Sequence, residues 1–65
     1  MNLRVNGKIE IVTAGNIAAY VNDKGLEPKS LVVEHNGRVV ISDQWADTAL
    51  NDGDQLELLS FVGGG

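Results

Sequence analysis

The first eleven residues show the alternation of apolar and polar positions that is typical of a β-hairpin. In the segment "LRVNGKIEI", residues 3–11, apolar side chains take every second position on each side of Asn6-Gly7. Asn-Gly accommodates the positive φ angles that a two-residue hairpin turn requires. We therefore expect two strands that share one apolar face. This expected face carries Leu3, Val5, Ile9 and Ile11.

The apolar spacing lengthens to that of a helix after this hairpin. Ile17 and Val21 lie four positions apart and would share one helix face. Asn16 is a preferred N-cap residue, and Gly25 stands where a helix commonly closes in the left-handed conformation. The pattern predicts one short helix over about residues 16–24, packed by its apolar stripe on the hairpin.

The rest of the chain predicts three further strands. "LVVEHNGRVVI", residues 31–41, is a second hairpin around Asn36-Gly37, and "SDQWADTAL", residues 42–50, is expected to be a loop with a turn of helix. Asp52-Gly53 then forms a turn before the last strand. This order predicts a two-layer α+β domain, a mixed sheet with one main helix on one face. Its first and last strands could lie side by side at the centre.

The last strand changes its pattern near the end. Leu56 and Leu58 take the inward positions, but Leu59 and Phe61 then continue the outward register. Without a bulge, these two residues lie exposed on the face away from the helix, as in a docking surface. With a bulge near residues 58–59, both would return to the core. Both alternatives are compatible with the sequence.

Composition narrows the function classes. The 65 residues allow one domain at most, and without cysteine the chain has neither disulfides nor a thiolate metal site. The net charge is −4, and the basic residues are scattered, which argues against nucleic acid and anionic membranes as partners. No apolar run approaches the roughly 18 residues of a spanning helix, so we expect a cytoplasmic protein. The scattered basic residues are Arg4, Lys8, Lys24, Lys29 and Arg38.

The polar residues most suggestive of chemistry have simpler structural explanations. His35 is the only histidine, and neither a second histidine nor a nearby carboxylate pair completes a convincing metal set, so a structural or solvent-facing role is expected rather than catalysis, which needs an oriented partner. Asp52 and Asp54 flank a glycine and are expected to shape a turn rather than bind a cation. Trp45 is expected to pack over one end of the core.

The chain ends in "FVGGG", and its terminal carboxylate is a candidate reactive group. This carboxylate is ionised at neutral pH, so it must be activated before it can react. Glycines can thread a narrow channel in conformations closed to other residues. Four residues from Val62 onward span at most about 13–14 Å when extended, enough to enter another protein's active site. The alternative is a frayed end without function.

The C-terminal third carries a resemblance to a known family. The segments "VISDQWADTAL" and "LNDGDQLELLSFVGGG", with the turn 52–54 and the closing Gly64-Gly65, resemble the bacterial sulfur carriers of thiamine biosynthesis, the ThiS family. The resemblance extends over the whole chain and implies a ubiquitin-like β-grasp fold. It implies a β-grasp domain over residues 1–62 and a flexible glycine tail over 63–65.

The resemblance also implies a mechanism and a set of site residues. An E1-like adenylyltransferase would use its own ATP and Mg²⁺ to adenylate the Gly65 carboxylate, and sulfur-relay proteins would convert it to a thiocarboxylate. Thiazole synthase would then receive the sulfur. The chain would be a protein cosubstrate and not an enzyme, and it would bind no cofactor or metal itself. The residues implied in partner binding are Gly64, Gly63, Val62, Phe61 and Leu59.

Two other functions share the fold and the ending. A sulfur carrier for molybdopterin synthesis is the nearest alternative, although those chains are usually longer. A ubiquitin-like module that binds partners without covalent chemistry is the other, and its tail would be chemically idle. The double glycine alone does not separate them.

Overall fold

The computed structural model describes residues 1–61, so the expected boundary at Val62 and the tail 63–65 lie outside the described residues. The described part contains five strands, one α-helix and two short 3₁₀ turns. The strands are β1 (Asn2–Val5), β2 (Lys8–Ile11), β3 (Leu31–His35), β4 (Arg38–Val40) and β5 (Gln55–Ser60). The helix is α1 (Ile17–Asp23), and the 3₁₀ turns cover Pro28–Ser30 and Ser42–Gln44.

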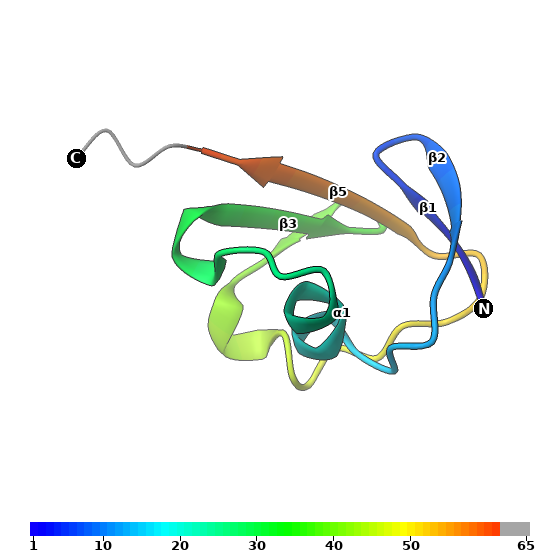
Figure 1. Ribbon diagram of the computed structural model, residues 1–65, viewed down its shortest axis with the longest axis horizontal. Helices are drawn as coiled ribbons and strands as arrows, with labels where there is room; N and C mark the ends of the chain where they lie inside the picture. The colour runs from blue at the N-terminus through cyan, green and yellow to red at the C-terminus, as the bar shows by residue number, and fades with distance from the viewer. Residues whose placement is uncertain (62–65) are drawn as a thin grey trace.

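The strands form a mixed sheet in the order β2-β1-β5-β3-β4. The first and last strands lie side by side at its centre and run parallel, whereas the other neighbours are antiparallel. The helix α1 covers one face of the sheet and leaves the other face open (Figure 1). We call this open side the outer face. The predicted two-layer α+β fold with a central pair of terminal strands is confirmed.

Both predicted hairpin turns are present. Asn6 and Gly7 have φ angles of 50° and 83°, and Asn36 and Gly37 have 50° and 86°. Two consecutive residues with positive φ form the turn type whose twist matches that of the flanking strands. The first turn also contacts the last strand, because the Asn6 side chain accepts a hydrogen bond of 2.7 Å from the Leu58 N–H.

The prediction of a single apolar face on the first hairpin is wrong for its second strand. The two-residue turn pairs Val5 with Lys8 and Arg4 with Ile9. Paired residues share a face of the sheet, so Ile9 and Ile11 lie on the outer face with Arg4. Their side chains are 62% and 81% exposed. The alternation was correct, but the turn reverses which residues of the second strand point inward.

The helix begins and ends where the sequence predicted, within one residue. The Asn16 side chain accepts a hydrogen bond of 2.8 Å from the Ala19 N–H, which is the N-cap interaction. Beyond the other end, Gly25 has a φ of 67°. The buried side of α1 consists of Ile17, Tyr20 and Val21.

The core lies between α1 and the inner face of the sheet. Among residues 1–61 it contains twelve buried hydrophobic residues, drawn from the helix, β1, β3, β5 and the connecting loops. Trp45 packs over one end, as predicted, and its Nε1 donates to the Val40 carbonyl at 2.8 Å. The buried residues are Leu3, Val5, Val12, Ala14, Ile17, Tyr20, Val21, Leu31, Val33, Trp45, Leu50 and Leu56.

Candidate functional site

The end of β5 exposes two apolar side chains on the outer face. The pairing of β3 with β5 runs without interruption from Leu56 to Ser60, so the bulge considered from the sequence is absent from this strand. The ladder continues one residue further, where the Phe61 N–H donates to the Ser30 carbonyl at 2.8 Å. Leu59 and Phe61 are 61% and 50% exposed. Of the two alternatives that the sequence left open, the strand without a bulge and with both side chains exposed is therefore the one present.

Leu59 and Phe61 belong to a larger apolar area, which we call the C-terminal apolar surface. Leu59 is paired with Val32 of β3, and exposed apolar residues of β4 and of the position after it extend the area toward the sheet edge. A hollow of about 330 Å³ lies beside it, where the pairing of β3 with β4 ends. The C-terminal apolar surface consists of Val32, Val39, Ile41, Leu59 and Phe61.

The hollow and the C-terminal apolar surface are continuous, because Val32, Val39 and Ile41 contribute to both. The exposed pair Ile9 and Ile11 belongs to the opposite edge of the same face, because β1 and β5 separate β2 from β3. The outer face therefore has two apolar regions at its two edges. Of these two regions, the C-terminal apolar surface is the one that contains Phe61, the described residue nearest to the C-terminus in the chain.

Two glutamates face each other across the β3–β5 pairing, next to the C-terminal apolar surface. Glu34 of β3 and Glu57 of β5 are direct cross-strand partners on the outer face. Within residues 1–61, neither makes an ion pair with a lysine, arginine or histidine. Like charges directly opposite each other destabilise a sheet. Nothing local in the sequence indicates this pairing, since it depends on the register of two distant strands.

The opposite end of β5 carries a polar cluster around Asp54. The Nε2 atom of His35 lies 2.8 Å from Asp54 Oδ2, and the two side chains are 17% and 13% exposed. Burial raises the pKa of Asp54, but hydrogen bonds from His35, from the Asn51 N–H and from Asn36 outweigh burial and hold it below its usual value. This cluster joins the β3–β4 hairpin to the start of β5, as a structural role for His35 predicts.

The aspartates around Gly53 have the turn-forming role that the sequence predicted. Asp52 Oδ1 accepts a hydrogen bond of 2.6 Å from the Asn2 N–H, and Asp54 Oδ2 accepts one of 2.9 Å from the Asn51 N–H. Gly53 has a φ of 89°. Among residues 1–61, no group of three histidine or acidic side chains is arranged to hold a metal ion.

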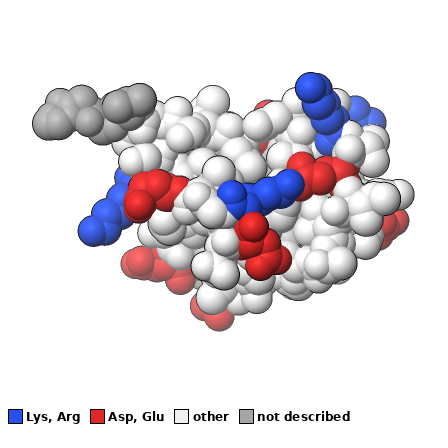
Figure 2. Space-filling view, in the orientation of Figure 1, with Lys and Arg blue, Asp and Glu red and all other residues white. Residues whose placement is uncertain are grey.

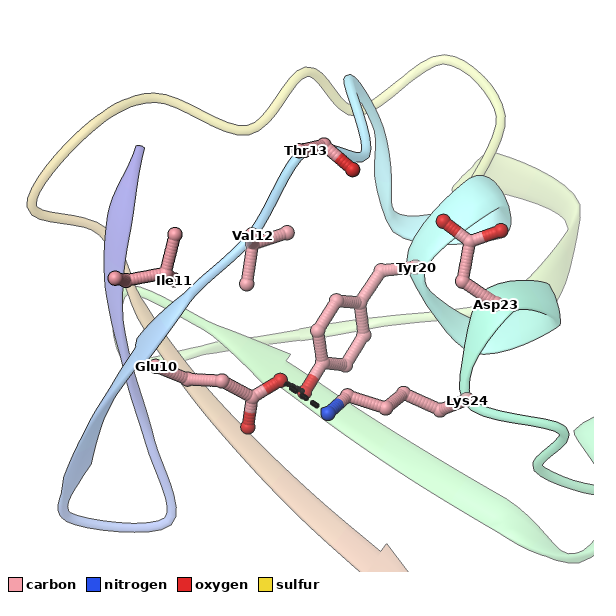
Figure 3. Close-up of a pocket in the computed structure, with 7 residues that line it drawn as sticks. All are labelled: Glu10, Ile11, Val12, Thr13, Tyr20, Asp23 and Lys24. Carbon is pink, nitrogen blue, oxygen red and sulfur yellow. Dashed lines mark hydrogen bonds and ion pairs between the residues drawn. The ribbon is translucent and has the colours of Figure 1, made fainter.

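Sequence reasoning missed a third cluster, which ties the edge strand β2 to the helix (Figure 3). The Tyr20 hydroxyl donates to Glu10 Oε1 at 2.8 Å, and Lys24 forms an ion pair with the same carboxylate. Lys24, and to a lesser degree Tyr20, lower the pKa of Glu10, whereas burial and Glu10 raise the pKa of Tyr20. The spacing of Tyr20 and Lys24, four residues apart on a helix, was the available signal.

The charged side chains visible in Figure 2 do not gather into one basic area. On the face that Figure 2 turns to the viewer, acidic and basic side chains are interspersed. In the described part of the chain, no helix has the length and hydropathy needed to cross a membrane.

Of the site residues expected from the sequence, the structure places Leu59 and Phe61 on one exposed apolar surface at the end of the central strand. Val62, Gly63, Gly64 and Gly65 lie outside the described residues. The roles of these residues in modification and partner binding therefore stay predictions.

The comparison with protein families decides which family the chain belongs to. A model described as "ThiS family" matches residues 3–65. The chain belongs to the ThiS family. The match covers the strands, the helix and the final glycines together, and the resemblance inferred from the C-terminal segments is confirmed.

Solved structures support the same assignment for this ThiS-family chain. A crystal structure of the thiamine biosynthesis protein (ThiS) from Geobacter metallireducens is 35% identical, with a TM-score of 0.85 and full coverage of both chains. A solution structure of a thiamine biosynthesis protein from the same organism has a TM-score of 0.81 at 35% identity, and the match covers this whole chain and 88% of that one. The expected β-grasp fold is confirmed.

A curated relative connects the family to a larger protein. Thiazole synthase from Paramagnetospirillum magneticum is 35% identical over 66 residues, and the match covers this whole chain. The chain spans 20% of the length of that relative. A domain similar to this chain is therefore part of a much longer protein that is named as thiazole synthase.

Proposed function

We propose that this chain is the sulfur carrier for thiazole formation in thiamine biosynthesis, with Gly65 as the residue that bears the sulfur. The observation that carries the proposal is the ThiS family match, which extends through the final glycine. The chain acts as a cosubstrate that is consumed and regenerated, and not as an enzyme.

The proposed chemistry has three steps at the terminal carboxyl group. A carboxylate oxygen of Gly65 attacks the α-phosphorus of ATP, pyrophosphate leaves, and an acyl-adenylate forms. A sulfur nucleophile from a relay protein then attacks the acyl carbon and displaces AMP. The nucleophile is the outer sulfur of a persulfide on the relay protein, so the product is an acyl disulfide. A further thiol then attacks the relay protein's sulfur in this disulfide, a new disulfide forms between the two thiol sulfurs, and the Gly65 thiocarboxylate leaves. ATP and Mg²⁺ belong to the adenylyltransferase, because this chain needs to supply only an ionised carboxylate.

The proposed roles of the remaining site residues follow from their position. Leu59 and Phe61 supply exposed apolar contacts for the partner enzymes at the end of β5. Val62, Gly63 and Gly64 connect this surface to Gly65, and the segment from Val62 onward spans at most about 13–14 Å. Glycines in this connection would let the carboxyl group pass through a narrow channel.

Thiazole synthase is the proposed acceptor of the sulfur. The similarity of the whole chain to a fifth of a protein named thiazole synthase supports this choice. It favours the thiamine pathway over molybdopterin synthesis, as do the two Geobacter metallireducens structures.

Intact-mass analysis tests the proposal. Incubation with the adenylyltransferase, ATP and a sulfur-relay system should raise the mass by the difference between sulfur and oxygen. Deletion of Gly64-Gly65 should abolish both this increase and ATP–pyrophosphate exchange, while the circular dichroism spectrum stays unchanged. Equal exchange by the truncated chain would refute Gly65 as the site. A full-length chain that is never modified would instead favour the non-covalent module.

The acceptor is tested separately with the thiocarboxylated protein. It should support thiazole formation when added to thiazole synthase with the other substrates, and the carboxylate form should not. Sulfur transfer to a molybdopterin precursor, with none to the thiazole, would support the alternative pathway.

A further inference from the structure

We propose that Glu34 and Glu57 form a recognition site for a basic side chain, preferably an arginine, on thiazole synthase. The inference rests on the proposed function, because it assigns a specific contact to the partner named there. It adds a polar contact to the apolar docking already proposed for Leu59 and Phe61.

The register of the sheet places the two glutamates directly opposite each other. Glu34 and Glu57 are direct partners in the β3–β5 ladder, one pair away from the end at which His35 is paired with Leu56. Direct partners in antiparallel strands have Cβ atoms about 4.5–5.5 Å apart. The repulsion between the two charges is not relieved by an ion pair within residues 1–61. A cation brought by a partner would relieve it.

The apolar residues beside Glu34 and Glu57 indicate which kind of basic side chain would fit there. Glu34 is paired with Val39 on its other side, and the pair next to the carboxylates along the ladder's outer face is Val32 with Leu59. Long basic side chains lay their apolar stem along such residues and keep the charged end on a carboxylate. Arginine fits best, because its planar fork of five donors can serve two carboxylates.

The other apolar region of the outer face lacks this combination. Ile9 is paired with Arg4, and Ile11 with Asn2, so no carboxylate lies in the outer-face pairs beside them. The chain's net charge of −4 also favours a basic partner surface during encounter. Of the two apolar regions of the outer face within residues 1–61, the C-terminal apolar surface is the one that adjoins both a glutamate pair without an ion pair and the end of β5.

A charge-removal experiment tests the inference. The double variant Glu34→Gln/Glu57→Gln keeps the shape of both side chains and removes their charge. Its matched control, Asp23→Asn/Asp47→Asn, changes the net charge equally at two exposed positions, on α1 and in the loop that packs beside it. The dissociation constant for thiazole synthase is measured by calorimetry for the wild type and both variants, at low and high salt.

We expect the Glu34→Gln/Glu57→Gln variant to bind about tenfold more weakly and with less salt dependence, while the control stays close to the wild type. The variant should unfold at the same temperature as the wild type or higher, because a repulsion has been removed. Equal affinity of the Gln variant and the wild type would overturn the inference. Failure of folded wild-type protein to bind the synthase would count against the proposed function itself.

Discussion

At the scale of single residues, Leu59 and Ile11 show why position decides the role of an exposed apolar side chain. Both lie on the outer face, and both are more than half exposed. Leu59 adjoins the residues that lead to Gly65, whereas Ile11 belongs to the edge strand β2 at the other side of the sheet. We therefore expect Leu59, and not Ile11, to contribute to the binding of a partner.

Leu59→Ser should weaken the complex with thiazole synthase about tenfold, as expected for an apolar residue at the centre of an interface. Thermal unfolding should change little, since the side chain is already exposed. Calorimetric titration measures the affinity, and Ile11→Ser is the matched control. Equal weakening by both variants would show that general hydrophobicity, and not this surface, determines binding.

The contacts of Asp54 predict an acid-sensitive contribution to stability. Its pKa lies below the ordinary value of 3.8, despite burial, because His35, Asn51 and Asn36 donate to the carboxylate. A lowered pKa contributes stability that is complete above the ordinary value and is lost as the pH falls toward the folded-state value. The free energy of unfolding should therefore drop below about pH 4.

Asp54→Asn should remove this part of the pH dependence and lower the stability at neutral pH by about 1–3 kcal/mol. Urea denaturation between about pH 3 and pH 7 measures both effects. The exposed Asp47→Asn serves as control, because Asp47 makes no side-chain ion pair in the described residues. If Asp54→Asn and the wild type lose stability in parallel on acidification, the cluster is not the source.

At the scale of elements, the helix α1 depends on its ends because it has only seven residues. So short a helix is not stable alone, and its cap and its packing hold it together. Asn16 supplies the cap, and the Glu10–Tyr20–Lys24 cluster ties the helix to β2.

Asn16→Ala should lower the free energy of unfolding by about 1 kcal/mol, because the Ala19 N–H loses its acceptor. Asn16→Ser should restore most of it, since serine is an equally good cap. Chemical denaturation of the three proteins measures the difference. Equal losses for alanine and serine would assign the effect to something other than capping.

The hairpins show how far element prediction could go. Each Asn-Gly turn was predictable from two adjacent residues, because the positive φ angles are a local property. The face of Ile9 and Ile11 was assigned wrongly, although the turn length already implied the pairing of Val5 with Lys8. Alternation alone gives two equivalent faces for each strand, and only the register across the turn selects one.

At the scale of the whole molecule, the small core gives the domain only a small free energy of unfolding. The parallel strands β1 and β5 bring together the first and last strands of the described chain, and Val5 with Leu56 is one of their two residue pairs. Both side chains are buried. A domain of this size has only a few kcal/mol of stability available against any disturbance there.

Val5→Asp should unfold the domain, because a charge without a partner would be placed in the core, at a cost above about 3 kcal/mol. Arg4→Ser, one position away and on the outer face, should fold normally. Amide proton NMR spectra distinguish the two outcomes. A dispersed spectrum for the aspartate variant would show that the core tolerates the charge.

The C-terminal apolar surface could be predicted only in part from the sequence. The outward register of Leu59 and Phe61 was readable from the last strand, though a bulge could have cancelled it, and only the unbroken β3–β5 pairing excluded that alternative. Val39 and Ile41 joined the same surface only through the sheet order. The neighbouring Glu34 and Glu57 were invisible as a pair, since nothing local links them.

The sequence by itself determined the turns, the helix with its cap, the α+β class and the chemical character of the glycine end. These properties depend on residues that are close together in the chain, where backbone preferences and side-chain spacing act directly. The tertiary structure decided the faces of the β2 residues, the pairing of Glu34 with Glu57 and the contact between His35 and Asp54. Each of these depends on the register or packing of separate segments, which is set by the packing of the whole core.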